Sequence, residues 1–106
     1  MAAVDGKPVC VLAPSDREVS LKRLAAAFAG KSAAMMRPAE AERLTGYHVG
    51  GISPLGQRKA VPTVVDAGSV ATGEAIHVNG GGRGLQIRIS PDDLLRALGA
   101  RTAELT

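Results

Sequence analysis

One glycine-rich stretch, residues 46–59, constrains the fold of this chain more than any other. It reads Gly-Tyr-His-Val-Gly-Gly-Ile-Ser-Pro-Leu-Gly-Gln-Arg-Lys, and β-branched residues follow it at 61–65. A hairpin turn needs only about two to five residues, so this loop is longer than a plain connection between strands requires. Its adjacent glycines, Gly50 and Gly51, allow a ligand to approach backbone N–H groups closely. A tight structural connection is the alternative, because Gly/Pro loops commonly serve that purpose.

A second glycine-rich stretch, Asn-Gly-Gly-Gly-Arg-Gly at 79–84, lies between two segments of alternating polarity. Alternation with a period of two is typical of a half-buried β-strand, so strands are expected at 75–78 and 85–89. This loop is predicted to be either a flexible hairpin tip or the second wall of a pocket. Arg83 is its one side chain suited to bind a phosphate.

The composition is that of one small folded domain spanning residues 1–106. Hydrophobic residues make up 45% and charged residues 22%, and no apolar run has the length of a membrane span. The N-terminus lacks a basic segment followed by an apolar one, so a cytoplasmic protein with no membrane partner is expected. Cys10 is the single cysteine and is expected to be a buried, inert thiol. His48 and His77 have no second ligand at metal spacing, so no metal or other cofactor is predicted; both are expected to be half-buried strand residues.

The charge balance is compatible with a nucleic-acid partner. Thirteen Lys and Arg residues against 10 Asp and Glu give a formal net charge of +3. Aromatic side chains are nearly absent, since Phe28 and Tyr47 are the only ones. Proteins that read single-stranded RNA by stacking need exposed aromatic side chains. Any RNA contact is therefore expected at backbone phosphates and at a terminus.

The remaining elements predict an α/β (or α+β) fold, a compact mixed, curved sheet or partial barrel with short helices. Asp5-Gly6 is a strong hairpin signal, but the arm before it is too short to pair properly. An unpaired hairpin edge would favour a homodimer. The other predicted elements are helices at 20–29, 39–45 and 90–98, a strand at 61–65, a turn at 66–69 and an edge strand at 101–105.

Residues 45–63 and 76–87, taken together, resemble the YbaK/EbsC family of aminoacyl-tRNA deacylases. The best-known members are Cys-tRNA(Pro) deacylases. The resemblance implies the compact fold shared with the editing insertion of bacterial prolyl-tRNA synthetases. It also implies trans-editing of a mischarged amino acid, most simply cysteine, on tRNA(Pro), with prolyl-tRNA synthetase as a possible partner. For cysteine, the substrate's own thiol is thought to attack its ester while the protein supplies positioning.

The resemblance also implies site residues. Backbone N–H groups around Gly50 would act as oxyanion donors. Asn79 stands where the family often has serine, and Gln86 where some members have aspartate. The full set comprises Gly50, Gly51 and Asn79 as catalytic residues, Ile52, Ser53, Pro54, Gly80, Gly81, Arg83 and Gln86 as substrate-binding residues, and Arg58 and Lys59 as tRNA contacts.

One departure from the family pattern favours a second hypothesis. Family members carry an N-terminal segment with a lysine important for activity, whereas this chain begins inside the hairpin. We therefore expect an editing domain that is N-terminally truncated relative to the family. The alternative function is a catalytically impaired module that retains the pocket and binds tRNA or a synthetase.

Overall fold

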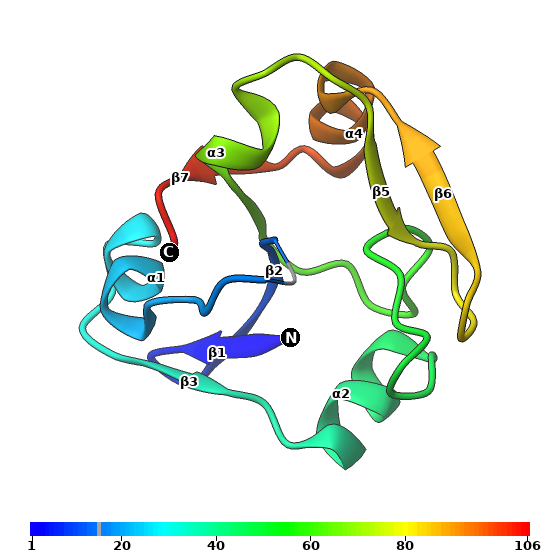
Figure 1. The fold of residues 1–106 in the computed structure, drawn as a ribbon. Helices are drawn as coiled ribbons and strands as arrows, with labels where there is room; N and C mark the ends of the chain where they lie inside the picture. The colour runs from blue at the N-terminus through cyan, green and yellow to red at the C-terminus, as the bar shows by residue number, and fades with distance from the viewer. Residues whose placement is uncertain (15) are drawn as a thin grey trace.

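The chain folds around a mixed five-stranded sheet and a separate two-stranded ribbon (Figure 1). The computed structural model describes residues 1–14 and 16–106. The sheet order is β3-β1-β2-β4-β7, and β5 pairs with β6 alone. This arrangement confirms the predicted α+β class with a mixed sheet. The strands are β1 (Ala2–Val4), β2 (Lys7–Leu12), β3 (Ala33–Met35), β4 (Thr63–Asp66), β5 (Ile76–Asn79), β6 (Gln86–Ile89) and β7 (Arg101–Ala103); the helices are α1 (Leu21–Ala27), α2 (Pro38–Thr45), α3 (Ala67–Val70) and α4 (Pro91–Leu98).

The predicted hairpin is present, but its first strand is fully paired. Asp5 and Gly6 both take positive φ, at 50° and 81°, as a tight two-residue hairpin turn requires. β1 pairs antiparallel with β2 on one side and with β3 on the other. The expectation of an unpaired hairpin edge is therefore wrong, and the edge that suggested a homodimer is occupied. The sequence signal missed β3 because Ala33–Met35 contains no β-branched or aromatic residue.

The centre of the sheet is parallel. β2 pairs with β4, and β4 pairs with β7, all in the same direction. The strand predicted at 61–65 begins later, at Thr63, and runs through Asp66. The Asp66 carboxylate accepts a hydrogen bond from the Leu105 N–H at 3.0 Å, which ties Asp66 to the C-terminal segment. The turn predicted at 66–69 is wrong, because the chain forms the single-turn helix α3 there.

The core lies between this sheet and α1. Its buried members are Ala2, Val4, Val9, Leu24, Val64 and Leu105. α1 begins after Ser20, whose Oγ accepts a hydrogen bond from the Arg23 N–H at 3.2 Å, as a helix N-cap does. Figure 1 shows α1 beside β7 and the C-terminus, while α2 and the β5–β6 ribbon lie on the other side of the molecule.

The glycine-rich segments lie on that other side. α2 ends at Gly46 with φ 81°, and the chain then runs between α2 and the ribbon before entering β4 (Figure 1). α4 follows the ribbon and begins after Ser90, whose Oγ accepts a hydrogen bond from the Asp93 N–H at 3.2 Å. The molecule therefore has its apolar core at one side and its glycine loops at the other. In the part of the chain that the structure describes, no helix has the length and apolarity to cross a membrane.

Candidate functional site

The two glycine-rich loops, far apart in sequence, meet in the fold. We call residues 46–58 the first loop and residues 79–84 the second loop. Asn79 joins them, because its Nδ2 donates to the Gly50 carbonyl oxygen at 3.2 Å and its Oδ1 accepts the Gly81 N–H at 2.7 Å. Gly51 lies directly on Gly82: a Cβ at Gly51 would stand 2.9 Å from Gly82 Cα. Only a residue without a side chain allows the two backbones to approach this closely.

Tyr47 supports this contact, and the sequence patterns did not assign it a role. Its hydroxyl donates to the Leu55 carbonyl oxygen at 2.6 Å, closing the first loop on itself. Its ring lies under the second loop, where a Cβ at Gly81 would stand 2.9 Å from Tyr47 Cε1. Tyr47, the one tyrosine of the chain, therefore closes the first loop through its hydroxyl and packs against the second loop through its ring. The sequence pattern, a Gly-Tyr pair after a predicted helix, does not predict these two contacts.

Hydrogen bonds inside the first loop use some of the groups expected to face a substrate. The Gly51 N–H donates to the His48 carbonyl oxygen at 2.8 Å, so it is not available as an oxyanion donor in this arrangement. Ser53 is 1% exposed, and its Oγ accepts the Leu55 N–H at 3.1 Å. Gln57 Nε2 donates to the Ser53 carbonyl oxygen at 2.9 Å. Ser53 therefore shapes the loop from within.

Other backbone donors of the two loops differ in availability. The Gly80 N–H donates to the Leu85 carbonyl oxygen at 2.8 Å, and the Gly81 N–H is held by Asn79. By contrast, among the described residues no acceptor pairs with the N–H groups of Gly50 and Ile52. These two N–H groups flank Gly51 and are free to receive an oxyanion, as are others in the loops, such as that of Gly82.

Two cavities of similar size lie beside the loop contact and share no lining residue. The first, of about 540 Å³, we call the apolar cavity; it is lined by Leu12, Ala13, Pro14, Asp16, Val65, Ser69, Ile76, His77, Val78, Asn79 and Gln86. The second, of about 520 Å³, we call the charged cavity; it is lined by Glu42, His48, Val49, Gly51, Gly81, Gly82 and Arg83. The predicted site residues are thus divided, with Asn79 and Gln86 in the apolar cavity and Gly51, Gly81 and Arg83 in the charged one.

Pro54 is buried and lines a smaller cavity of about 200 Å³ that also involves residues of α4. The predicted tRNA contacts, Arg58 and Lys59, are both exposed but are directed to different places. Arg58 packs against Gly46, at the start of the first loop. Lys59 lines a cavity of about 440 Å³ with the β1–β2 hairpin. The structure therefore does not bring these two cations together beside the loop contact.

Cys10 is buried, as expected. Burial raises the pKa of its thiol above the ordinary value, which disfavours the nucleophilic thiolate. Gln57 Nε2 lies 3.7 Å from its Sγ. Cys10 is therefore a packing residue in this environment.

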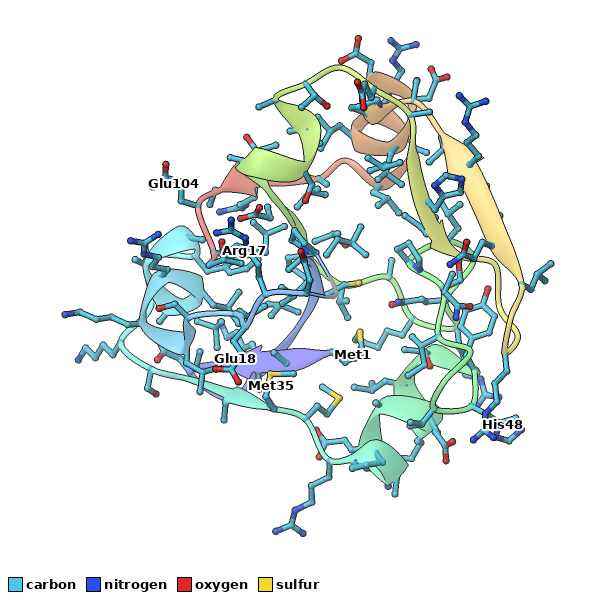
Figure 2. The ribbon with its side chains drawn as sticks, viewed as in Figure 1. Met1, Arg17, Glu18, Met35, His48 and Glu104 are labelled. Atoms are coloured by element: carbon cyan, nitrogen blue, oxygen red, sulfur yellow. The ribbon has the colours of Figure 1, made fainter. Side chains whose placement is uncertain are left out.

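The expected half-burial of the two histidines is wrong, and only His77 is the strand residue that was expected. His48 lies in the first loop with its side chain 97% exposed, and Figure 2 shows it at the periphery of the molecule; His77 is exposed on β5. The alternating pattern around His77 predicted the strand correctly, and His77 lies there opposite Arg88, which is exposed as well. Within residues 1–14 and 16–106, no three His, Cys, Asp or Glu side chains are grouped as a metal site requires.

The chain is similar to known proteins over most of its length. The family model of the aminoacyl-tRNA editing domain matches residues 1–97. EbsC of Enterococcus faecalis, a protein assigned as a Cys-tRNA(Pro)/Cys-tRNA(Cys) deacylase, is 37% identical over 99 residues. That match covers 93% of this chain and 60% of EbsC, so the chain spans about three fifths of the relative's length.

Solved structures share the fold. A protein assigned as a trans-editing enzyme for prolyl-tRNA synthetase superposes with a TM-score of 0.86 at 23% identity, covering 99% of this chain and 66% of that one. The hypothetical protein APE2540 superposes with a TM-score of 0.84 at 27% identity, covering 98% of this chain and 69% of that one. The described loops and ribbon therefore belong to an architecture found in longer proteins.

Proposed function

This chain belongs to the YbaK/EbsC branch of the aminoacyl-tRNA editing domain family, and we propose that it is a trans-acting deacylase that removes cysteine mischarged onto tRNA(Pro). The observation that carries the proposal is the contact between the two loops, in which Asn79 bonds to Gly50 and Gly51 lies on Gly82. These loops are the two segments that resemble the family. Their meeting at one place supports a single editing site.

In the proposed reaction, this site positions the ester that joins cysteine to the tRNA. In the proposed reaction the cysteinyl thiol attacks its own ester carbonyl, a C–S bond forms, and the C–O bond to the tRNA breaks. The tRNA oxygen leaves with the proton that the thiol gives up. The charge that develops on the carbonyl oxygen is received by the N–H groups of Gly50 and Ile52, for which no described residue supplies another acceptor.

The apolar cavity is the proposed place for the aminoacyl side chain. Six of its eleven lining residues are apolar, among them Val65 and Val78. Asn79 and Gln86 are its amide-bearing members and are suited to hydrogen-bond the α-amino group or the ester. Gln86 is uncharged, so it serves in binding rather than as an acid or base. Cys10, being buried, takes no part as a nucleophile.

The proposed partner is aminoacylated tRNA in the cytoplasm, with prolyl-tRNA synthetase as a second partner. The second partner is suggested by the similar structure assigned as a trans-editing enzyme for that synthetase. The exposed cations Arg58 and Lys59 are proposed to contact the tRNA at separate points, as their placement requires. The net charge of +3 favours association with RNA in general.

The direct test is release of cysteine from Cys-tRNA(Pro), with Pro-tRNA(Pro) and Ala-tRNA(Pro) assayed alongside. We expect the cysteinyl ester to be cleaved fastest, since only it carries the attacking thiol. Cys10→Ala is the matched control and should retain the rate. If cooperatively melting protein cleaves none of the three esters yet binds the tRNA, the chain is the alternative, a binding module, and the deacylase proposal is wrong.

A further inference from the structure

The charged cavity has a chemistry that the editing reaction, as proposed, does not use. It lies between the C-terminal half of α2, the first loop and the second loop, and shares no lining residue with the apolar cavity. Its walls carry one carboxylate, one imidazole and one guanidinium: Glu42, His48 and Arg83. Gly81 and Gly82 form the side between them, where a bulky ligand can approach the backbone.

The carboxylate in this cavity is held in place. Glu42 Oε2 accepts the Val49 N–H at 2.8 Å, which fixes it to the first loop. The same oxygen lies 3.5 Å from His48 Nδ1. His48 is therefore placed beside an acceptor while the rest of its ring is open to solvent. A carboxylate and an imidazole so arranged can pair with hydroxyl groups.

Arg83 is the cation of the charged cavity. Arg83 is exposed and makes one long contact from Nη2 to the Val49 carbonyl oxygen, at 3.5 Å. A guanidinium has five N–H donors, so most of them remain for a ligand. Its Nε lies beside Gly50, since a Cβ there would stand 2.9 Å from it. Arg83 is thus close to the loop contact at which the ester is proposed to react.

We propose that the charged cavity binds a ribose–phosphate unit of the tRNA acceptor end, with Arg83 on the phosphate and Glu42 and His48 on ribose hydroxyls. This inference rests on the proposed function, because it names how the RNA part of the substrate is held. A phosphate alone would be repelled by Glu42, whereas a ribose supplies hydroxyl donors that a carboxylate accepts. The apolar and charged cavities would then hold the two unlike halves of one substrate, on either side of the ester.

The test uses an uncharged acceptor-stem RNA hairpin ending in CCA, with binding followed by fluorescence anisotropy. Arg83→Ala should weaken binding about tenfold and lower the salt dependence by about one phosphate contact. Arg88→Ala removes an exposed arginine from β6, opposite His77 in the same ribbon, and is the matched control with an expected change near zero. Equal losses of affinity for the two arginine variants would mean that RNA binding depends on net charge alone, and the inference would be overturned.

The ribose contact is tested with Glu42→Gln, which keeps an oxygen for the Val49 N–H, and with His48→Ala. Each should weaken the RNA several-fold but have little further effect on a hairpin whose last nucleotides are 2′-deoxy, because the contact is already lost there. Equal losses on both hairpins overturn the ribose assignment. Free CMP and AMP form another arm: binding as tight as that of the hairpin, and abolished by Arg83→Ala, would assign the cavity to free nucleotides instead.

Cysteine release separates this inference from the proposed function. If the chain cleaves Cys-tRNA(Pro) and Arg83→Ala alters neither hairpin binding nor KM, the deacylase stands and the subsite does not. If no ester is cleaved while Arg83→Ala and Glu42→Gln selectively weaken the hairpin, the subsite stands in a module that binds without catalysing. An effect on KM with kcat retained is the expected pattern, since the subsite contacts no reacting atom.

Discussion

Glycine serves two different purposes in two regions of this molecule. At Gly6, in the β1–β2 hairpin, φ is 81° and a Cβ would meet nothing within 4 Å, so glycine is there for the turn conformation alone. At Gly51, in the first loop, a Cβ would stand 2.9 Å from Gly82 Cα, so glycine is there for the contact. The sequence alone does not distinguish these two glycines. Only the second glycine is tied to the geometry of the candidate site, and substitutions should separate the two.

The largest effect is expected for Gly51→Ala. The added methyl group meets backbone atoms of Gly82, which cannot rotate away, so the two loops must separate. A displacement of about 1 Å at a reacting centre costs on the order of 100-fold in rate, and we expect that loss in cysteine release. Gly82→Ala is the control, because its Cβ would meet only Leu85 Cβ at an ordinary 3.9 Å. The two rates are compared at saturating substrate, since Gly82 also lines the charged cavity. Similar losses in both variants would show that the contact has no special role.

Asn79→Ala should have the next largest effect. It removes the donor to the Gly50 carbonyl oxygen and the acceptor of the Gly81 N–H, while leaving the backbone contact in place. We expect about a tenfold loss of cysteine release, or 1.4 kcal/mol of transition-state stabilisation. Arg88 of the same ribbon is exposed and lines neither cavity, so Arg88→Ala should leave the rate unchanged. A full rate in Asn79→Ala would mean that the loops hold their positions without this bridge.

Gly6→Ala should instead lower stability and spare the site. A left-handed backbone costs a residue with a Cβ about 1 kcal/mol, and no clash adds to that cost here. For a domain of this size we expect a fall in Tm of about 5 °C, measured by calorimetry. The rate of cysteine release at a temperature where both proteins are folded should not change. A selective loss of rate would connect the hairpin to the site and remove the contrast with Gly51.

The sequence predicted the elements better than the contacts between them. The strand periodicity at 75–78 and 85–89, the helices at 39–45 and 90–98, and the hairpin at Asp5-Gly6 are local patterns, and the structure bears them out. β3 was missed because Ala33–Met35 is a strand only by virtue of its pairing with β1. The difference is one of range, since local conformation is encoded in neighbouring residues and pairing is not.

The same limit applies to the candidate site. Resemblance placed Gly50 and Asn79 in one site, and the structure joins them by a hydrogen bond. Nothing in the first loop's sequence shows that the Gly51 N–H donates to the His48 carbonyl oxygen, or that the Tyr47 ring packs against the second loop. Which of several glycine N–H groups stays free depends on a fold that brings distant segments together. That part of the site is determined by the tertiary structure alone.

The smallest effect expected is a change in the pH dependence of stability at the hairpin. The backbone N–H groups of Ser32 and Lys31 donate to the Asp5 carboxylate and hold its pKa below the ordinary value. A lowered folded-state pKa stabilises the fold above the unfolded-state value of about 4, and this contribution is lost as the pH falls through the folded-state pKa. Asp5→Asn keeps one acceptor oxygen and suits φ 50°, so the turn should persist. Urea unfolding between pH 5 and 2 should show a smaller loss of stability in Asp5→Asn than in the wild type. Equal losses would mean that these N–H groups favour the charged carboxylate no more than water does, and the hairpin would then depend on its backbone conformation alone, as proposed for Gly6.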